Sequence, residues 1–159
     1  MTHFLVLLLA LLIGVVAGLR ALTPPAVVAW AAFLQWINLD GTWAEWLAHP
    51  ITVTILTILL VVELVTDQLP KTPSRKSAPQ FAARLISGAF AGAVIGTAWG
   101  YTIGGAGAGV VGAVIGTLGG FEARRRLSAA TGHDFPVALA EDAVAVLAGF
   151  GIAALTAVL

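Results

Sequence analysis

The chain has 159 residues, of which 59% are hydrophobic and only 10% are charged. Its mean hydropathy of +0.98 lies far outside the range of water-soluble domains, which need more polar surface. Eight basic residues balance eight acidic residues, so we expect no binding to nucleic acid. The absence of cysteine excludes disulfides, thiolate catalysis and cysteine-ligated metals.

Long apolar blocks recur from one end of the chain to the other. A helix needs about 17 to 25 apolar residues to cross a hydrocarbon core of roughly 30 Å. The pattern predicts an all-α polytopic membrane helix bundle with six transmembrane helices, over residues 3–20, 24–39, 50–69, 82–100, 103–121 and 135–158. The second block is short and begins with Thr23-Pro24-Pro25, so it either spans the membrane or is re-entrant.

The basic residues predict how the chain is threaded. Every Lys and Arg falls in or beside the links that precede the second, fourth and sixth blocks. Because Lys and Arg are retained on the cytoplasmic side, both termini are predicted to be periplasmic. The aromatic residues agree, since Trp36, Trp43, Trp46, Trp99 and Tyr101 all map to the opposite interface. If the second block were re-entrant, Arg20 alone would break this rule, so the charges favour six crossings.

The blocks divide into two groups of three. Residues 1–69 form a first half, residues 70–81 a cytoplasmic linker rich in Pro, Ser and Lys, and residues 82–159 a second half. An odd number of spans per half turns the second half upside down relative to the first. This predicts a 3+3 inverted-topology repeat, an arrangement that is common in transporters.

Glycine is concentrated in the fourth and fifth blocks. Twelve of the 18 glycines lie between residues 88 and 120, many of them four apart. Such spacing gives a helix a smooth face, which lets backbones approach closely in lipid. We therefore predict a glycine-zipper hairpin packed within the chain, through Gly88, Gly92, Gly96, Gly112 and Gly116. The alternative is a subunit interface or pore lining, which leaves a homo-oligomer open.

Charged residues within the blocks are the candidate functional groups. A charge at the bilayer centre costs at least roughly 2.5–3.5 kcal/mol on insertion scales, so such residues are rarely idle. Two acidic pairs and two arginines all map toward the cytoplasmic side. The predicted substrate- or ion-binding residues are Glu63, Asp67, Glu141, Asp142, Arg20 and Arg84.

Two interpretations of these charges stay open. In the first, Arg20 and Arg84 neutralise two carboxylates and lock the bundle. In the second, the deeper Glu63 and Glu141 carry protons, coordinate a cation, or hold a divalent ion for a phosphate-bearing lipid. The histidines share no metal-ligand spacing, and no cofactor is predicted.

Three signatures resemble those of a known family. The segment Glu63-Leu-Val-Thr-Asp67-Gln68-Leu-Pro70, followed after the linker by Arg84 and a small-residue helix, is similar to small bacterial inner-membrane proteins of domain-of-unknown-function family 4126. Residues 18–20 (Gly-Leu-Arg) and 140–145 (Ala-Glu-Asp-x-x-Ala) resemble the other two signatures. Gln68 departs from the usual Lys, so a strict ion pair at that position is in doubt. The resemblance implies an inner-membrane location and brings no established activity.

The leading functional hypothesis is a small transporter or channel-like protein that moves a small solute or ion through a cytoplasm-facing acidic site. One alternative is a lipid-phosphate enzyme, since Glu63 and Asp67 with Ser74 and Arg75 resemble the acidic pair and serine–arginine loop of polyprenyl-diphosphate phosphatases. Another is a structural membrane subunit. The sequence favours a non-enzymatic protein, whose expected partners are membrane lipids and a small solute or ion.

Overall fold

A computed structural model describes residues 1–69 and 77–159 of the chain. Within these ranges the protein has six α-helices, one short 3-10 helix and no strand, which confirms the all-α prediction. The helices are α1 (His3–Leu19), α2 (Thr23–Phe33), η1 (Glu45–Ala48), α3 (Pro50–Thr66), α4 (Ala78–Ala98), α5 (Thr102–Thr131) and α6 (Asp134–Val158).

Three of these helices, α4, α5 and α6, are long and apolar enough to cross a membrane. The others are shorter, with 17 residues in α1, 11 in α2 and 17 in α3. At 1.5 Å per residue, α2 is about 16 Å long, roughly half of a hydrocarbon core. The prediction of a helix to residue 39 is wrong, because the backbone leaves the helix at Gln35, whose φ is +59°. By their length and composition, α4, α5 and α6 indicate a membrane protein.

The expected bounds of two other helices also change. α5 continues ten residues beyond residue 121, so the arginine run lies on the helix and the link is only Gly132 and His133. Glu122 supports this extension by ion pairs with Arg125 and Arg126, both at 2.6 Å. The helix ends at Gly132 in the left-handed conformation that commonly terminates helices. α4 begins at Ala78 rather than residue 82, with a proline in its first turn.

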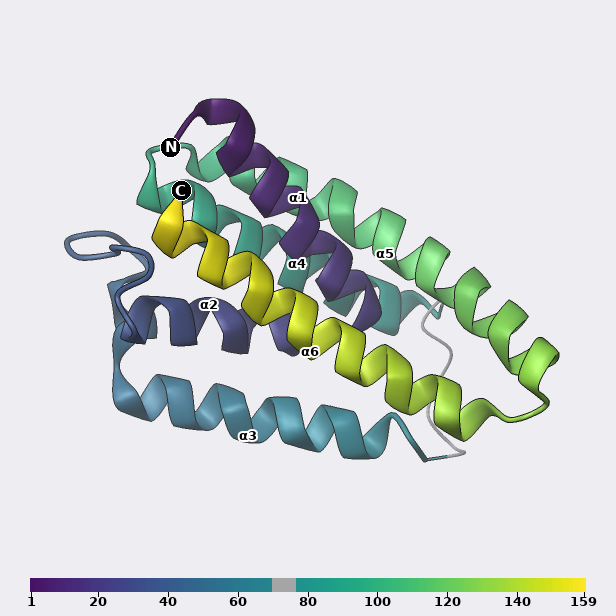
Figure 1. Cartoon of the computed structure of the whole chain (residues 1–159). Helices are drawn as coiled ribbons and strands as arrows, with labels where there is room; N and C mark the ends of the chain where they lie inside the picture. Colours follow the sequence, from purple (N-terminus) through teal and green to yellow (C-terminus); the bar gives the residue numbers. More distant parts are fainter. Residues whose placement is uncertain (70–76) are drawn as a thin grey trace.

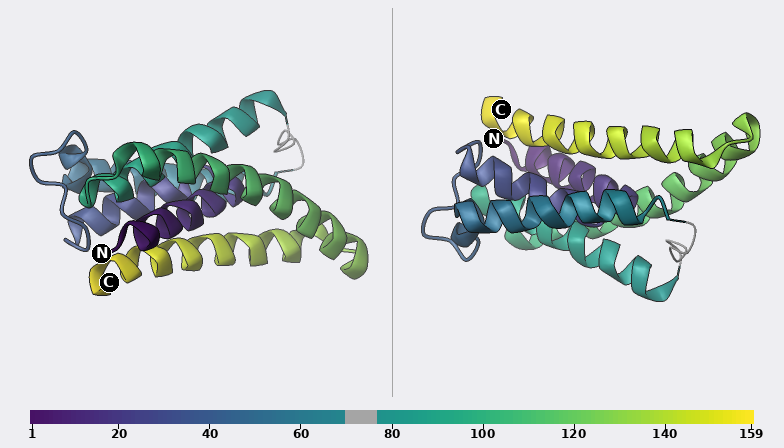
Figure 2. Two further views of the ribbon diagram at one scale, coloured as in Figure 1. Left: turned by 90° about the horizontal axis from the view of Figure 1, so that it is seen from above. Right: turned by 90° about the horizontal axis from the view of Figure 1, so that it is seen from below.

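Successive helices run in alternating directions through one bundle (Figure 1). Both termini lie at the same end as the segment between α2 and α3 and the turn between α4 and α5. The turns that join α1 to α2 and α5 to α6 lie toward the other end. Two further views show α6 running along one side of the bundle, with α5 and α6 converging toward the tip of their hairpin (Figure 2).

The closest backbone packing joins α1, α4 and α5. A Cβ added at Gly88 of α4 would lie 2.6 Å from the carbonyl oxygen of Gly109, and one added at Gly14 of α1 would overlap the same carbonyl. Gly109 of α5 therefore lies between two neighbouring helices with no room for a side chain. Similar close approaches involve Gly18 of α1, Gly92 and Gly96 of α4, and Gly105, Gly112 and Gly116 of α5. Backbones this close gain dispersion contacts, which drive helix association in lipid.

The other apolar side chains lie either in the core or on the outer surface of the bundle. Val6, Ile13, Val27 and Val94 are fully buried where α1, α2 and α4 meet. By contrast, α3 exposes a row of large apolar side chains, Ile51, Ile55, Ile58, Leu59, Val62 and Val65. An outward face of this kind suits contact with lipid rather than water.

The glycine packing predicts a difference between two neighbouring glycines of α5. Gly109→Ala places a methyl group against the α4 backbone, so it should lower the free energy of unfolding by about 1–3 kcal/mol. Gly107 is exposed and has no atom within 4 Å of an added Cβ, so Gly107→Ala should leave stability unchanged or slightly higher. Unfolding of both purified variants in mixed micelles measures this. Equal losses of stability in the two variants would contradict the packing.

Candidate functional site

Charged side chains from three helices gather around the corner between α1 and α2. We define the α1–α2 corner as residues 18–22. α1 ends at Leu19 and α2 begins at Thr23, so the last carbonyls of one helix and the first N–H groups of the other have no partners within their own helices. In so apolar a protein these groups need partners from the protein itself.

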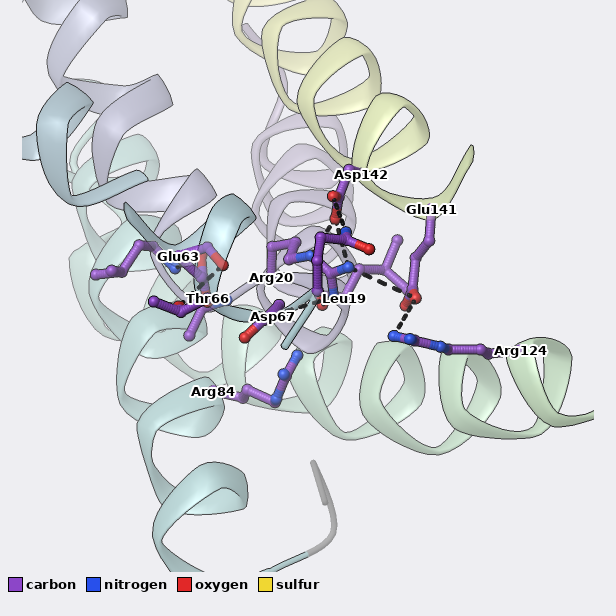
Figure 3. A network of polar contacts seen from close by, with 12 residues as sticks. Leu19, Arg20, Glu63, Thr66, Asp67, Arg84, Arg124, Glu141 and Asp142 are labelled. Carbon is purple, nitrogen blue, oxygen red and sulfur yellow. Dashed lines mark hydrogen bonds and ion pairs between the residues drawn. The ribbon is translucent and has the colours of Figure 1, made fainter. Parts of the chain in front are cut away.

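Glu63 of α3 binds the N–H groups of the corner. One carboxylate oxygen accepts a hydrogen bond from the backbone of Ala21 and the other from Leu22, both at 2.8 Å. The carboxylate also lies at the N-terminus of α2, where the helix dipole favours a negative charge. Glu63 is thus held by backbone donors of the corner. Figure 3 shows Glu63 beside the Arg20 cluster.

Two side chains of α4 bind the carbonyls of the corner. Arg84 is 3% exposed, and its guanidinium donates to the carbonyl oxygen of Gly18 at 2.7 Å. The hydroxyl of Ser87 donates to the carbonyl oxygen of Ala21. A cation at the C-terminal end of α1 is also favoured by the helix dipole. α4 is therefore bound to the carbonyl side of the corner and α3 to its N–H side.

Arg20 forms the centre of a second set of contacts, the Arg20 cluster, made up of Arg20, Asp67, Glu141 and Asp142 (Figure 3). Its side chain is 1% exposed, and Nε donates to Asp142 at 2.5 Å, while a second guanidinium nitrogen contacts the same carboxylate. Asp67 lies 3.4 Å from the third guanidinium nitrogen, and Glu141 lies 3.8 Å from the nitrogen that also contacts Asp142. Arg20 also donates to the carbonyl oxygen of Leu19 at 3.0 Å. One guanidinium thus joins α1 to the end of α3 and to α6.

Two residues that the sequence did not single out as site residues extend this cluster. The amide of Gln68, at the position where the resemblance expects a lysine, donates to Asp142 at 2.7 Å. Arg124 lies 3.5 Å from Glu141 and pairs with Asp134 through two nitrogens. The sequence signal for Arg124 is Gly132. A helix predicted to end at that glycine would include Arg124 and place it opposite Glu141.

The structure therefore places the six predicted site residues around one end of α1, in two arrangements. Asp67, Glu141 and Asp142 each contact Arg20, whereas Glu63 and Arg84 contact the backbone of the corner. Within residues 1–69 and 77–159, no group of three His, Cys, Asp or Glu residues is arranged to hold a metal ion. Ser74 and Arg75, which the enzyme hypothesis uses, lie outside the described residues.

Removing the central cation should destabilise the protein strongly. Arg20→Met leaves the buried Asp142 carboxylate without its main partner, which typically costs about 3–5 kcal/mol of unfolding free energy. The double variant Arg20→Met/Asp142→Leu removes both charges, so it should be more stable than Arg20→Met alone. Arg126, which is 75% exposed, is the matched control, and Arg126→Gln should change stability by less than about 0.5 kcal/mol.

Unfolding of the four proteins in mixed micelles compares these effects. If Arg20→Met were as mild as Arg126→Gln, or if the double variant were less stable than Arg20→Met, the cluster would not hold the helices together.

Comparison with known proteins places the chain in a family. The family model described as "Domain of unknown function (DUF4126)" matches residues 7–150, which include all six predicted site residues. No curated protein and no solved structure matches the chain. The matched range covers most of the sequence and agrees with the resemblance carried by the segments around Arg20, Glu63 and Glu141. This chain belongs to the DUF4126 family.

Proposed function

We propose that this protein is an integral protein of the bacterial inner membrane that moves a small ion or solute through an acidic site facing the cytoplasm. The observation that carries this proposal is the Arg20 cluster, in which one buried guanidinium meets three carboxylates from two other helices. Asp67 belongs to the first half of the chain, whereas Glu141 and Asp142 belong to the second. A polar site between two halves is the arrangement expected of a transporter.

The proposal includes a topology with six crossings. Every Lys and Arg among the described residues lies at or near the end of the bundle that holds the α1–α2 corner and the α5–α6 turn, so this end would face the cytoplasm. Both termini would then be periplasmic. The segment after α2 would complete the second crossing, since α2 itself is about 16 Å long. The 3+3 inverted repeat stays part of the proposal, although the helices of the first half are the shorter ones.

The unequal distances in the cluster suggest how it would work. Asp142 is bound tightly to Arg20, whereas Asp67 and Glu141 lie at 3.4 and 3.8 Å and make looser ion pairs. A proton or cation on Asp67 or Glu141 would weaken the attraction of that carboxylate to Arg20. Because Asp67 sits at the end of α3, its neutralisation would loosen α3 from α1. Neutralisation of Glu141, by contrast, would leave Asp142 as the remaining ion pair between α6 and Arg20.

A structural membrane subunit is the second candidate, because the same ion pairs would serve to lock a bundle. A structural subunit would use its glycine faces to recruit a partner. In this protein, however, Gly14, Gly88 and Gly109 face one another within the helix bundle. These close approaches support the proposal of an intramolecular glycine zipper, which favours transport over a partner-recruiting surface. The lipid-phosphate enzyme has no observation among the described residues that favours it.

Flux through proteoliposomes tests the proposal. Purified protein is reconstituted, and entry of H⁺, Na⁺, K⁺ and Cl⁻ is followed with dyes inside the vesicles under an imposed potential. We expect a flux above that of empty vesicles for one of these ions. Asp67→Asn and Glu141→Gln should each lower it by about tenfold or more, because each removes a charge from the conducting site.

The exposed Glu122 offers a matched control, and Glu122→Gln should keep the wild-type flux. Both site variants must first show an unfolding transition like that of the wild type. If the folded wild type carried none of the four ions, or if both site variants carried them as well as wild type does, the structural role would replace transport.

A further inference from the structure

A cleft of about 230 Å³ opens between the C-terminal part of α5 and the first turns of α6. α5 contributes Ala123, Arg124 and Leu127, and α6 contributes Ala140, Glu141 and Val144. The lining residues are thus spaced alike along the two helices. On each helix, one charged residue lies between two apolar residues. The cleft borders the Arg20 cluster, since Glu141 belongs to both, but Arg20 itself does not line it.

The cleft is suited to an acyl chain. Apart from Arg124 and Glu141, its walls are apolar, and Leu19 at the end of α1 also lines it. The neighbouring surface is also apolar, with Leu127, Phe135 and Leu139 each about half exposed or more. In a membrane, an open apolar cleft on the side of a helix pair is filled by lipid rather than water. The arginine run beside it marks the boundary between hydrocarbon and headgroups.

The mouth of the cleft carries both signs of charge. The Arg124 side chain is 22% exposed and lies between Asp134, which is 61% exposed, and Glu141. A headgroup with only negative charge would meet both carboxylates. A quaternary ammonium group has no hydrogen to donate to them. A headgroup that joins a phosphate to a primary ammonium group matches the cation and the carboxylates together.

We propose that this cleft binds a phospholipid of the phosphatidylethanolamine type, with one acyl chain between α5 and α6. Its phosphate accepts hydrogen bonds from Arg124, and its ammonium group donates to Asp134. A phosphate on Arg124 competes with Glu141 for the same guanidinium and leaves Glu141 to Arg20. The bound lipid therefore acts next to the Arg20 cluster. This inference rests on the membrane location alone and is independent of transport.

Native mass spectrometry of the purified full chain tests the site. The protein is mixed with equal amounts of phosphatidylethanolamine, phosphatidylcholine and phosphatidylglycerol that carry the same acyl chains. We expect phosphatidylethanolamine to be retained about fivefold more than either of the others, since one ion pair near the membrane surface contributes this much. Asp134→Asn should abolish the preference over phosphatidylcholine while lipid is still retained.

Filling the cleft should remove the lipid. Ala140 is exposed on the α6 wall, and Ala140→Phe occupies the space of the acyl chain. Ala123→Phe fills it from the α5 wall, so the test survives if one variant fails to fold. Ala154 is exposed on α6 outside the cleft, and Ala154→Phe should retain lipid as the wild type does.

The result that would overturn the inference is equal retention of all three lipids, which indicates annular lipid only. Undiminished retention by folded Ala140→Phe or Ala123→Phe would overturn it as well. A preference for phosphatidylglycerol would replace the proposed headgroup with an anionic one. None of these outcomes depends on ion flux, so the lipid site and the transport proposal fail or stand separately.

Discussion

The fold depends on satisfying the backbone polar groups at the corner where α1 turns into α2. Arg20 in this corner is only 1% exposed, so backbone groups there have little access to water and need partners inside the protein. Glu63 accepts from the N–H groups of Ala21 and Leu22, and Arg84 donates to the carbonyl of Gly18. The partners come from α3 and α4, which are therefore fixed against the corner. Glu63 and Arg84 therefore stabilise the fold, in addition to any functional role.

Two different forces hold the helices together. α1, α4 and α5 pack through glycine faces, where backbones such as those of Gly88 and Gly109 nearly touch. α3 and α6 are also joined to α1 by charges, through Arg20 and the carboxylates around it. Dispersion contacts are indifferent to protons and ions, whereas ion pairs respond to both. The glycine-packed helices can therefore stay fixed while α3 and α6 respond to a bound ion, which is the division that the transport proposal needs.

The sequence predicted the gathering of the charges but not their individual partners. Charges are rare in apolar blocks, and the rule for Lys and Arg placed Arg20, Arg84 and the two acidic pairs on one side. Pairing depends on helix phase and helix ends, which composition does not determine. The contact of Glu63 with backbone N–H groups needed the true start of α2, and the role of Arg124 needed α5 to run on to Gly132. The early end of α2 at a left-handed Gln35 had no sequence signal, because glutamine rarely adopts that conformation.

The most direct test of this account is hydrogen exchange at the backbone amides of Ala21 and Leu22, measured for the protein in lipid nanodiscs. The account predicts that both amides are protected in the wild type and that Glu63→Leu makes them exchange about tenfold faster or more, while the amides of the glycine-packed part of α5 stay unchanged. Glu63→Gln keeps one acceptor oxygen and should show an intermediate effect. Equally slow exchange of Ala21 and Leu22 in the wild type and in Glu63→Leu would contradict the claim that buried side chains hold this corner.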